Sequence, residues 1–203
     1  MKLYDGGRAP NPRRVRVFLA EKGIKIDIVP VDIGNREHKT DSYSAINPLQ
    51  RVPSLVLDDG TVITESIAIC RYFEGLQPEP NLFGEPGLEA AQVEMWNRRL
   101  ELHLLLPVAQ VFRHLHPAMK ALEVPQIAEW GEANKPHVAH FLNLLDGELA
   151  QRKFIAGNRY TVADITALMA VDLMKPAKLI VPDTLANVRR WYADINARPS
   201  SAA

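Results

Sequence analysis

The chain has 203 residues, a length that accommodates one large domain or two small ones with a buried core. Its 24 lysines and arginines balance its 24 aspartates and glutamates, so no basic excess indicates nucleic acid or an anionic membrane as a partner. No apolar run approaches the roughly 20 residues of a membrane-spanning helix, and the first residues lack the apolar core of a signal peptide, so we expect a cytoplasmic protein. Because Cys70 is the single cysteine, the chain cannot form an internal disulfide.

The first part of the chain predicts a β-α-β unit. Residues 2–5 are a strand candidate, and Asn11-Pro12 predicts a helix start, with the asparagine as N-cap and the proline at the first helical position. Apolar residues follow at helical spacing as far as Gly23, which predicts the end of the helix. Residues 26–31 predict a second strand, and Pro30 places it at a sheet edge. The parallel crossover is expected to be right-handed.

The next part predicts a hairpin followed by a helix. Residues 34–44 are polar and predict a loop with a short helix, and Asn47-Pro48 marks a turn. Two short apolar runs, 54–57 and 61–63, predict strands joined by the turn Asp-Asp-Gly at 58–60. Glu65-Ser66 then opens an apolar helical segment.

Two features of this stretch suit a peptide-like ligand with an amino-acid end. Pro53 has no N–H to donate, so it fits the start of a strand, where a cis bond would leave the main chain of Val52 open to an extended ligand. Ser66 at a helix start favours a carboxylate, and Glu65 beside it could hold an ammonium group. A plain hairpin with a helix cap explains the same residues, and both interpretations stay open.

The second half predicts helices only. Residues 77–87 hold three prolines and two glycines and predict a linker. Residues 88–114 predict a helix that Pro107 kinks or divides near residue 106, and 127–151 predict one or two helices with Pro136 as an interruption. A capping box at 161–164 precedes a nearly continuous apolar run, 165–174, expected at the centre of the second core. Residues 185–197 predict an amphipathic final helix, whose apolar face carries Val188, Trp191, Tyr192 and Ile195.

The order of elements in the first half is that of a thioredoxin-like fold. The segments YDGGRAPNPRRVRVFLAEKGI, NPLQRVPSLVLDDG and ESIAICRYF resemble the N-terminal domain of cytosolic glutathione transferases, and FIAGNRYTVADI resembles their helical domain. The resemblance covers essentially the whole chain. It implies a thioredoxin-like glutathione-binding domain at 1–76 with a mixed four-stranded sheet and a cis-proline, the linker at 77–87, an all-helical domain at 88–203, and a homodimer.

The resemblance also implies a glutathione site. Glu65 and Ser66 would take the γ-glutamyl end of glutathione, and Val52 before Pro53 would pair with the cysteinyl main chain. The glycine carboxylate would lie near His38, Lys39 and Gln50. His38 and Lys39 are equally explained as a solvated loop, and Gln50 as a side chain in water. Three arginines on the first helix are interpreted as surface charge: Arg13, Arg14 and Arg16.

The source of the thiolate is the open question. A free thiol with a pKa near 8.5 is mostly protonated at neutral pH; the family activates it with a Tyr, Ser or Cys near the first helix, where this chain has Ala9. The start of the first helix, Asn11 or Arg8, or a water held by the second domain remain as alternatives. EHK at 37–39 and RRLELHLLLPVAQVFRHLHP at 98–117 are similar to an atypical fungal and bacterial group that lacks a catalytic Tyr, Ser or Cys.

In that group a serine and a histidine of the second domain hold the activating water. The serine position matches Ala109 here, so His114 is the nearest candidate, ahead of Gln110 and His116; a structural histidine explains His114 as well. Cys70 is interpreted as a small buried hydrophobe.

We therefore expect a glutathione transferase of detoxification type that acts on small, largely apolar electrophiles. Their pocket is expected between residues 6–9 and 107–116, with Phe112 and Leu115 as candidate walls. No metal site is expected, because His103, His114 and His116 have no carboxylate or cysteine at ligand spacing. The alternatives are a non-catalytic glutathione-binding or regulatory protein and a glutathione-dependent isomerase or dehalogenase.

Overall fold

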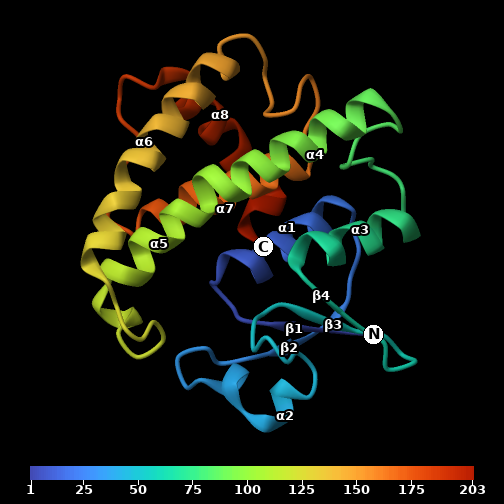
Figure 1. The fold of residues 1–203 in the computed structure, drawn as a ribbon. Coiled ribbons are helices and arrows are strands. Elements are labelled where there is room, and N and C mark those ends of the chain that lie inside the picture. The colour runs from blue at the N-terminus through green and yellow to red at the C-terminus, as the bar shows by residue number, and fades with distance from the viewer. The chain divides into compact units, whose positions relative to one another are not determined.

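The computed structural model describes residues 1–203 and divides into two compact units. One unit consists of Met1–Asn81 with Pro199–Ala203, and the other of Leu82–Arg198 (Figure 1). The division falls inside the segment 77–87 for which a linker is predicted. The last five residues group with the first unit, where the main-chain oxygen of Ser201 accepts a hydrogen bond of 2.6 Å from Arg13 Nη2. No helix combines the length and apolarity needed to span a membrane.

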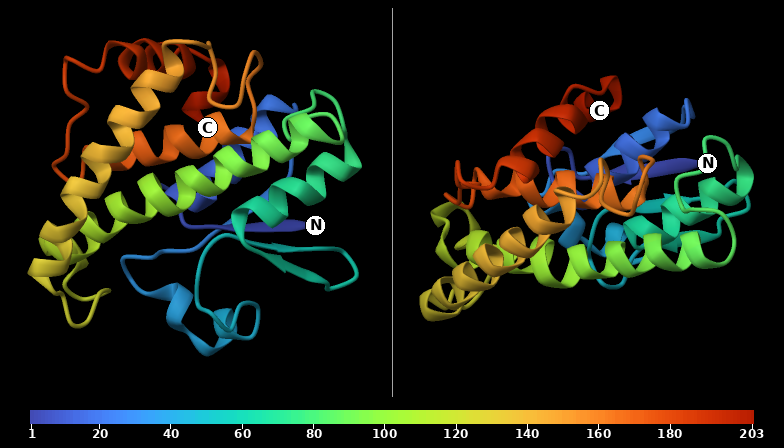
Figure 2. Two further views of the ribbon diagram at one scale, coloured as in Figure 1. Left: turned by 45° about the horizontal axis from the view of Figure 1, so that its top comes forward. Right: turned by 90° about the horizontal axis from the view of Figure 1, so that it is seen from above.

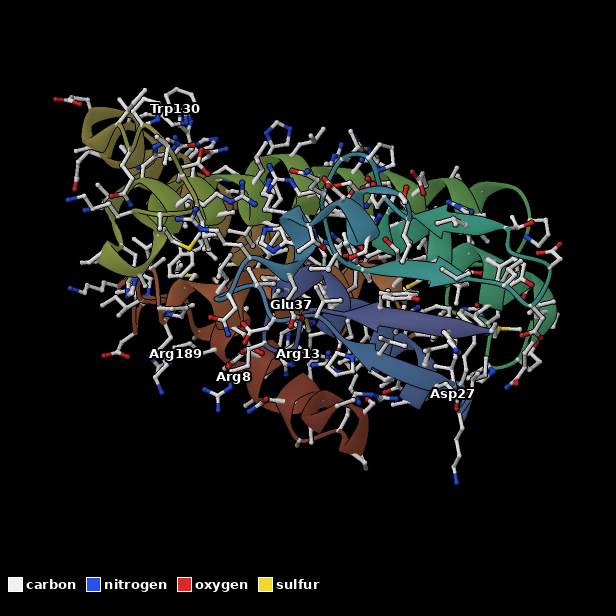
Figure 3. All side chains as sticks on the ribbon, turned by 90° about the horizontal axis from the view of Figure 1, so that it is seen from below. Arg8, Arg13, Asp27, Glu37, Trp130 and Arg189 are labelled. Atoms are coloured by element: carbon white, nitrogen blue, oxygen red, sulfur yellow. The ribbon has the colours of Figure 1, made fainter.

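The first unit contains the predicted mixed sheet of four strands. The strands are β1 (Lys2–Asp5), β2 (Asp27–Pro30), β3 (Ser54–Val56) and β4 (Val62–Thr64), in the spatial order β2-β1-β3-β4. β1 and β2 are parallel, whereas β3 is antiparallel to both β1 and β4. Pro30 ends the edge strand β2, as expected for a residue that cannot donate to a ladder, and Figure 3 labels Asp27 at the other end of that strand.

Two helices cover one face of this sheet. α1 (Pro10–Glu21) and α3 (Ser66–Leu76) pack against each other on that face, while α2 (Asp41–Ser44) and the short 3-10 helix η1 (Glu37–Lys39) lie on the other side (Figure 1). The core between sheet and helices consists of fully buried apolar side chains, among them Leu3, Val15, Phe18, Leu55 and Ile69. This burial on one face of each element is what holds the unit together.

The predicted start of the first helix is wrong by two residues. α1 begins at Pro10, and Ala9 rather than Asn11 occupies the N-cap position, with φ −62° and ψ 141°. Proline disfavours the helical conformation of the residue before it, so Ala9 stays extended and Pro10 takes the first helical position, although Asn11 before Pro12 is helical. Ala9 makes no side-chain capping bond, because a methyl group has no acceptor.

The second unit is helical throughout. Figure 2 shows α4 (Leu88–Leu100) and α5 (Leu106–Leu115) as one long rod, joined by a π-helical turn at Glu101–Leu105. The predicted change near Leu106 is a change of helix type and not a break: the chain stays helical, and the π turn ends one residue before Leu106. α6 (Ala128–Leu149) is a single helix, so of the one or two helices predicted for 127–151 the structure has one, and Pro136 lies inside it. Pro136 has no N–H, so the carbonyl of Glu132 loses its helical hydrogen bond. Both residues are exposed, so water can donate to this carbonyl instead.

The apolar run predicted for the centre of the second core is α7 (Val162–Met174). All of its residues except Asp172 and Leu173 are buried, and the predicted capping box is present, with Thr161 and Asp164 bonded reciprocally. α8 (Ala186–Asn196) packs against it and buries Val188, Trp191 and Ile195 of the predicted apolar face. Tyr192, predicted on the same face, is half-buried.

Candidate functional site

Three loops meet at one end of the sheet in the first unit. The register pairs Tyr4 of β1 with Ser54 of β3, and Ser54 with Thr64 of β4. Because β3 is antiparallel to both β1 and β4, the residues after β1, those before β3 and those after β4 all leave the sheet at the same end. Val52 and Ser66 therefore belong to neighbouring loops and lie on the same side of the unit, as a shared ligand would require.

The loop between β1 and α1 lies directly against Val52. A β-carbon placed on Gly6 would lie 2.6 Å from Val52 Cγ2 and 2.6 Å from Ile33 Cδ1, which is closer than atoms can approach. A larger residue at position 6 would therefore require the side chains of Val52 and Ile33 to shift. The contact brings the start of α1 to the strand edge predicted to bind a ligand.

The main-chain N–H and C=O of Val52 have no hydrogen-bond partner, whereas the carbonyl of the preceding residue, Arg51, has two. The peptide bond between Val52 and Pro53 is cis. The carbonyl of Arg51 accepts from the hydroxyl of Tyr43 at 2.7 Å and from Asn47 Nδ2 at 2.8 Å. Val52 lies outside the helices and strands and makes no main-chain hydrogen bond, so its N–H and C=O are available to a ligand. Pro53 is buried, so its ring shapes this turn and offers little surface to a ligand.

Glu65 and Ser66 form the start of α3. Glu65 is exposed, has no ion-pair or hydrogen-bond partner for its carboxylate, and holds a φ of +65°, which is unusual for a residue with a side chain. The first helical bond runs from Ile69 N to the carbonyl of Glu65 at 3.0 Å, so the amides of the preceding residues remain open. These amides and the helix dipole favour an anion, and the Glu65 carboxylate favours a cation beside it.

Sequence reasoning missed the buried arginine behind Ser66. Arg14 is 1% exposed, and its Nη1 donates to Ser66 Oγ at 3.1 Å. Since Ser66 Oγ accepts from the guanidinium, the hydroxyl hydrogen is left to donate to a ligand. The arginine also places a positive charge below the anion-binding end of α3.

The interpretation of all three arginines of α1 as surface charge is therefore wrong. Arg16 Nη1 donates to both carboxylate oxygens of Asp5 at 2.6 Å, and Arg13, labelled in Figure 3, bonds to Ser201 as described above. Burial raises the pKa of Asp5, and the charge and hydrogen bonds of Arg16 act in the opposite direction. The three arginines of α1 thus bind the end of β1, the C-terminal segment and the start of α3.

The candidates for the glycine carboxylate are spread over two loops. Gln50, with φ +55°, donates from Nε2 to Ser44 Oγ at 2.9 Å, so it does not simply point to water. The side chain of Lys39 is exposed and has no hydrogen-bond or ion-pair partner. His38 is 5% exposed, and its Nδ1 has no hydrogen-bond partner. Burial lowers the pKa of His38, with smaller effects from the charges of Lys39 and Arg51, so the imidazole is neutral at pH 7.

The start of α1 offers a single main-chain donor. Pro10 and Pro12 have no N–H. The amide of Ala9 donates to the carbonyl of Gly6 at 3.3 Å, and the amide of Arg13 donates to the carbonyl of Ala9 at 3.2 Å. Asn11 alone retains an open amide, and its exposed side chain has no partner. The sequence analysis gives the start of the first helix and Asn11 as separate sources of thiolate stabilisation. In the structure both are the same residue, Asn11.

His114, the candidate catalytic histidine of the second unit, makes contacts typical of a structural histidine. His114 is 9% exposed; its Nδ1 accepts from Ile127 N at 3.0 Å, and its Nε2 lies 3.9 Å from a carboxylate oxygen of Glu123. His116 Nδ1 accepts from Ala118 N, and Gln110 accepts from Trp130 Nε1. A catalytic role for His114 stays a prediction that this geometry does not favour. No group of three or more His, Cys, Asp or Glu side chains is arranged to hold a metal ion.

Cys70 is part of the core and not of the site. It is fully buried on α3, and burial raises the pKa of its thiol from 9.0 to about 12. We expect iodoacetamide at pH 8.5 to leave Cys70 unmodified in the folded protein and to alkylate it after unfolding, as mass spectrometry would show. Rapid labelling of the folded protein would contradict the burial.

The same shift predicts a loss of stability in alkali. Between pH 9 and 12 the unfolded chain loses the thiol proton while the folded protein keeps it, so the free energy of unfolding falls as pH rises. Denaturant titrations should show a smaller fall for Cys70→Ala, which has no thiol to ionise.

Comparisons with known proteins match residues of both units. Residues 9–76 match the family model of the glutathione S-transferase N-terminal domain, and residues 114–199 match that of the glutathione S-transferase C-terminal domain. Glutathione S-transferase 2 of Saccharomyces cerevisiae is 36% identical over 203 residues, which span 98% of this chain and 87% of that protein.

Solved structures give the same result. A glutathione S-transferase domain-containing protein from Marinobacter aquaeolei has a TM-score of 0.95 and 40% identity, over 98% of this chain and 99% of that chain. Gtt2 from Saccharomyces cerevisiae has a TM-score of 0.95 and 36% identity, over 100% of this chain and 99% of that chain. These fungal and bacterial relatives confirm the predicted resemblance. The chain belongs to the glutathione S-transferase family.

Proposed function

We propose that the protein is a glutathione transferase that joins the sulfur of glutathione to small, largely apolar electrophiles. The observation that supports this most strongly is the meeting of the open main chain of Val52 with the unpaired Glu65 and the arginine-backed Ser66 at one end of the sheet. An extended tripeptide with an amino-acid end needs both features, and a plain hairpin with a helix cap needs neither.

The proposed pose follows from the charges of glutathione. The γ-glutamyl carboxylate lies at Ser66 and the open amides of α3, and its ammonium group lies at Glu65. The cysteinyl main chain pairs with Val52 as an added strand pairs with a sheet edge. The glycine carboxylate lies towards Lys39, Gln50 and the neutral His38, which can donate a hydrogen bond from a ring N–H.

The reaction is the attack of the glutathione thiolate on an electrophilic carbon. The thiol loses its proton, the carbon–sulfur bond forms, and the leaving group departs with the electron pair of the bond that breaks. Ala9 has no hydroxyl or thiol to stabilise the thiolate. The open amide of Asn11, with its side-chain amide and the dipole of α1, is the group of this unit that can lower the pKa of the sulfur.

The substitution Asn11→Asp tests this assignment. A carboxylate beside the sulfur should raise the pKa of the bound thiol by about one unit, so the pH profile of kcat/KM for a chloronitrobenzene electrophile should move to higher pH. Because acidic residues stabilise a helix start, the fold should be unaffected. Asn143→Asp, on the exposed side of α6, is the matched control. An unchanged profile for Asn11→Asp would remove Asn11 from the reaction.

The second candidate function is a glutathione-binding protein without catalysis, and Ala9 is the observation that favours it. Retention on glutathione resin, with no conjugation of halogenated or unsaturated electrophiles above the uncatalysed rate, would support this candidate. A glutathione-dependent isomerase or dehalogenase would use the same thiolate, and product analysis separates it, since an isomerase returns glutathione unchanged. The homodimer and the cytoplasmic location implied by the family resemblance remain predictions, and light scattering checks the first.

A further inference from the structure

A pocket of about 370 Å³ in the first unit is lined by three arginines: Arg8, Arg13 and Arg16. Ala202 and Ala203 complete the lining, and no aspartate or glutamate belongs to it. Figure 3 labels Arg8 and Arg13. The volume lies in the range of pockets that hold small molecules. All five residues of this arginine pocket belong to the first unit, and none is a proposed glutathione-binding residue.

The arginine pocket and the proposed glutathione site use different faces of α1. Arg13 and Arg16 are three positions apart on this helix, so their side chains leave it on the same side. Arg14 lies between them in the sequence, is buried, and donates to Ser66 at the start of α3. A ligand in the arginine pocket therefore leaves the start of α3 open.

Two of the three guanidinium groups are held in place by the protein. Arg16 binds both carboxylate oxygens of Asp5 at 2.6 Å through Nη1 alone, so its Nε and Nη2 groups can donate to a ligand. Arg13 Nη2 donates to the main-chain oxygen of Ser201 at 2.6 Å, which fixes this guanidinium against the C-terminal segment. Because these side chains are positioned before a ligand arrives, binding loses less side-chain entropy.

The third guanidinium group, that of Arg8, comes from the loop before α1. Arg8 is exposed, and its side chain has no hydrogen-bond or ion-pair partner. The three guanidinium groups face one carboxylate, that of Asp5, so positive charge is in excess in the arginine pocket. It stays in excess if a carboxylate at Ala203 is counted. The pocket therefore favours an anion.

We propose that the arginine pocket binds the tetrahedral phosphate dianion, either as free phosphate or as the end of a small phosphate monoester. Guanidinium groups from a loop and from one helix face approach the ligand from different directions. Phosphate has an oxygen for each of them, whereas a carboxylate has only two oxygens in one plane. The methyl groups of Ala202 and Ala203 offer an apolar surface to the body of an ester. This binding goes beyond the proposed transferase reaction and does not depend on it.

The test is a calorimetric titration of the full chain with inorganic phosphate and with phenyl phosphate, at pH 8 and constant ionic strength. We expect saturable binding at one site, and at least about tenfold weaker binding by Arg8→Glu, because a charge-assisted hydrogen bond is replaced by repulsion. Arg36→Glu changes the net charge equally at an exposed arginine outside the pocket and should bind normally. Equal affinity in the two variants, or no saturable binding by the wild type, would overturn the proposal.

The two ligands and a third anion define what the pocket recognises. Tighter binding of phenyl phosphate than of inorganic phosphate would identify a monoester as the ligand, and equal binding would identify free phosphate. Acetate, a planar monoanion, should bind at least about tenfold more weakly than either, because it has fewer oxygens and less charge. Acetate binding as tight as that of phosphate would contradict the proposed preference for a tetrahedral dianion.

Two further variants separate phosphate binding from folding and from the glutathione site. Asp5→Asn keeps the size of the side chain and removes the carboxylate that competes for Arg16, so it should bind phosphate about threefold more tightly or better. Impaired folding cannot produce tighter binding, and unchanged or weaker binding would contradict the role of Arg16. Ser66→Ala should bind phosphate normally. A loss there would show that phosphate occupies the start of α3 and would overturn the assignment to the arginine pocket.

Discussion

Replacing Ser66 with alanine is expected to weaken glutathione binding about tenfold or more while the protein stays folded. The hydroxyl accepts from Arg14, which leaves its hydrogen to donate to the proposed ligand carboxylate. A hydrogen bond to a charged group contributes about 1.5–3 kcal/mol, and about 1.4 kcal/mol corresponds to a factor of ten in affinity. The open amides of α3 are unchanged in this variant, so binding is reduced and not abolished. Calorimetric titration with reduced glutathione measures the effect.

The controls for this prediction are matched in chemistry. Ser42→Ala removes an exposed hydroxyl from the first turn of α2 and should leave the affinity unchanged. Glu65→Gln keeps the size of the side chain and removes the charge proposed for the ammonium group, so it should also weaken binding. Wild-type affinity in both Ser66→Ala and Glu65→Gln would refute the proposed position of the γ-glutamyl end.

Replacing Asp164 with alanine is expected to lower the free energy of unfolding by about 3–5 kcal/mol, the largest effect of any single change considered. Its carboxylate is fully buried and accepts from Thr161 N at 2.9 Å, Ile155 N at 3.0 Å and Trp191 Nε1 at 2.9 Å. Burial raises the pKa of Asp164, and these bonds act in the opposite direction, so the charge depends on them. Alanine would leave all three donors buried without an acceptor.

Denaturant unfolding followed by circular dichroism checks this prediction. Asp183→Ala removes a carboxylate that is 92% exposed and paired only with Arg189, so it should change the free energy of unfolding by less than about 1 kcal/mol. Similar losses in the two variants would mean that the Asp164 network is not the element that holds α7, Trp191 of α8 and the loop at Ile155 together.

Features set by neighbours in the sequence were predictable. The capping box of α7 joins residues three apart, and two short apolar runs joined by Asp58-Asp59-Gly60 predict the hairpin of β3 and β4. Both appear within one residue of where the sequence places them. The start of α1 was misplaced because Pro10 and Pro12 are both suited to a first helical turn, and the choice between them depends on the extended conformation of Ala9.

The proposed site divides in the same way. Residues with special local chemistry are visible in the sequence: Pro53 after Val52, and Glu65-Ser66 at the start of a helix. The folded chain is needed to see that Arg14, 52 positions before Ser66, lies buried behind its hydroxyl, and that Tyr43 and Asn47 occupy the carbonyl next to Val52. Turn and capping preferences act over a few residues, whereas the burial of a charged side chain depends on which distant elements pack around it.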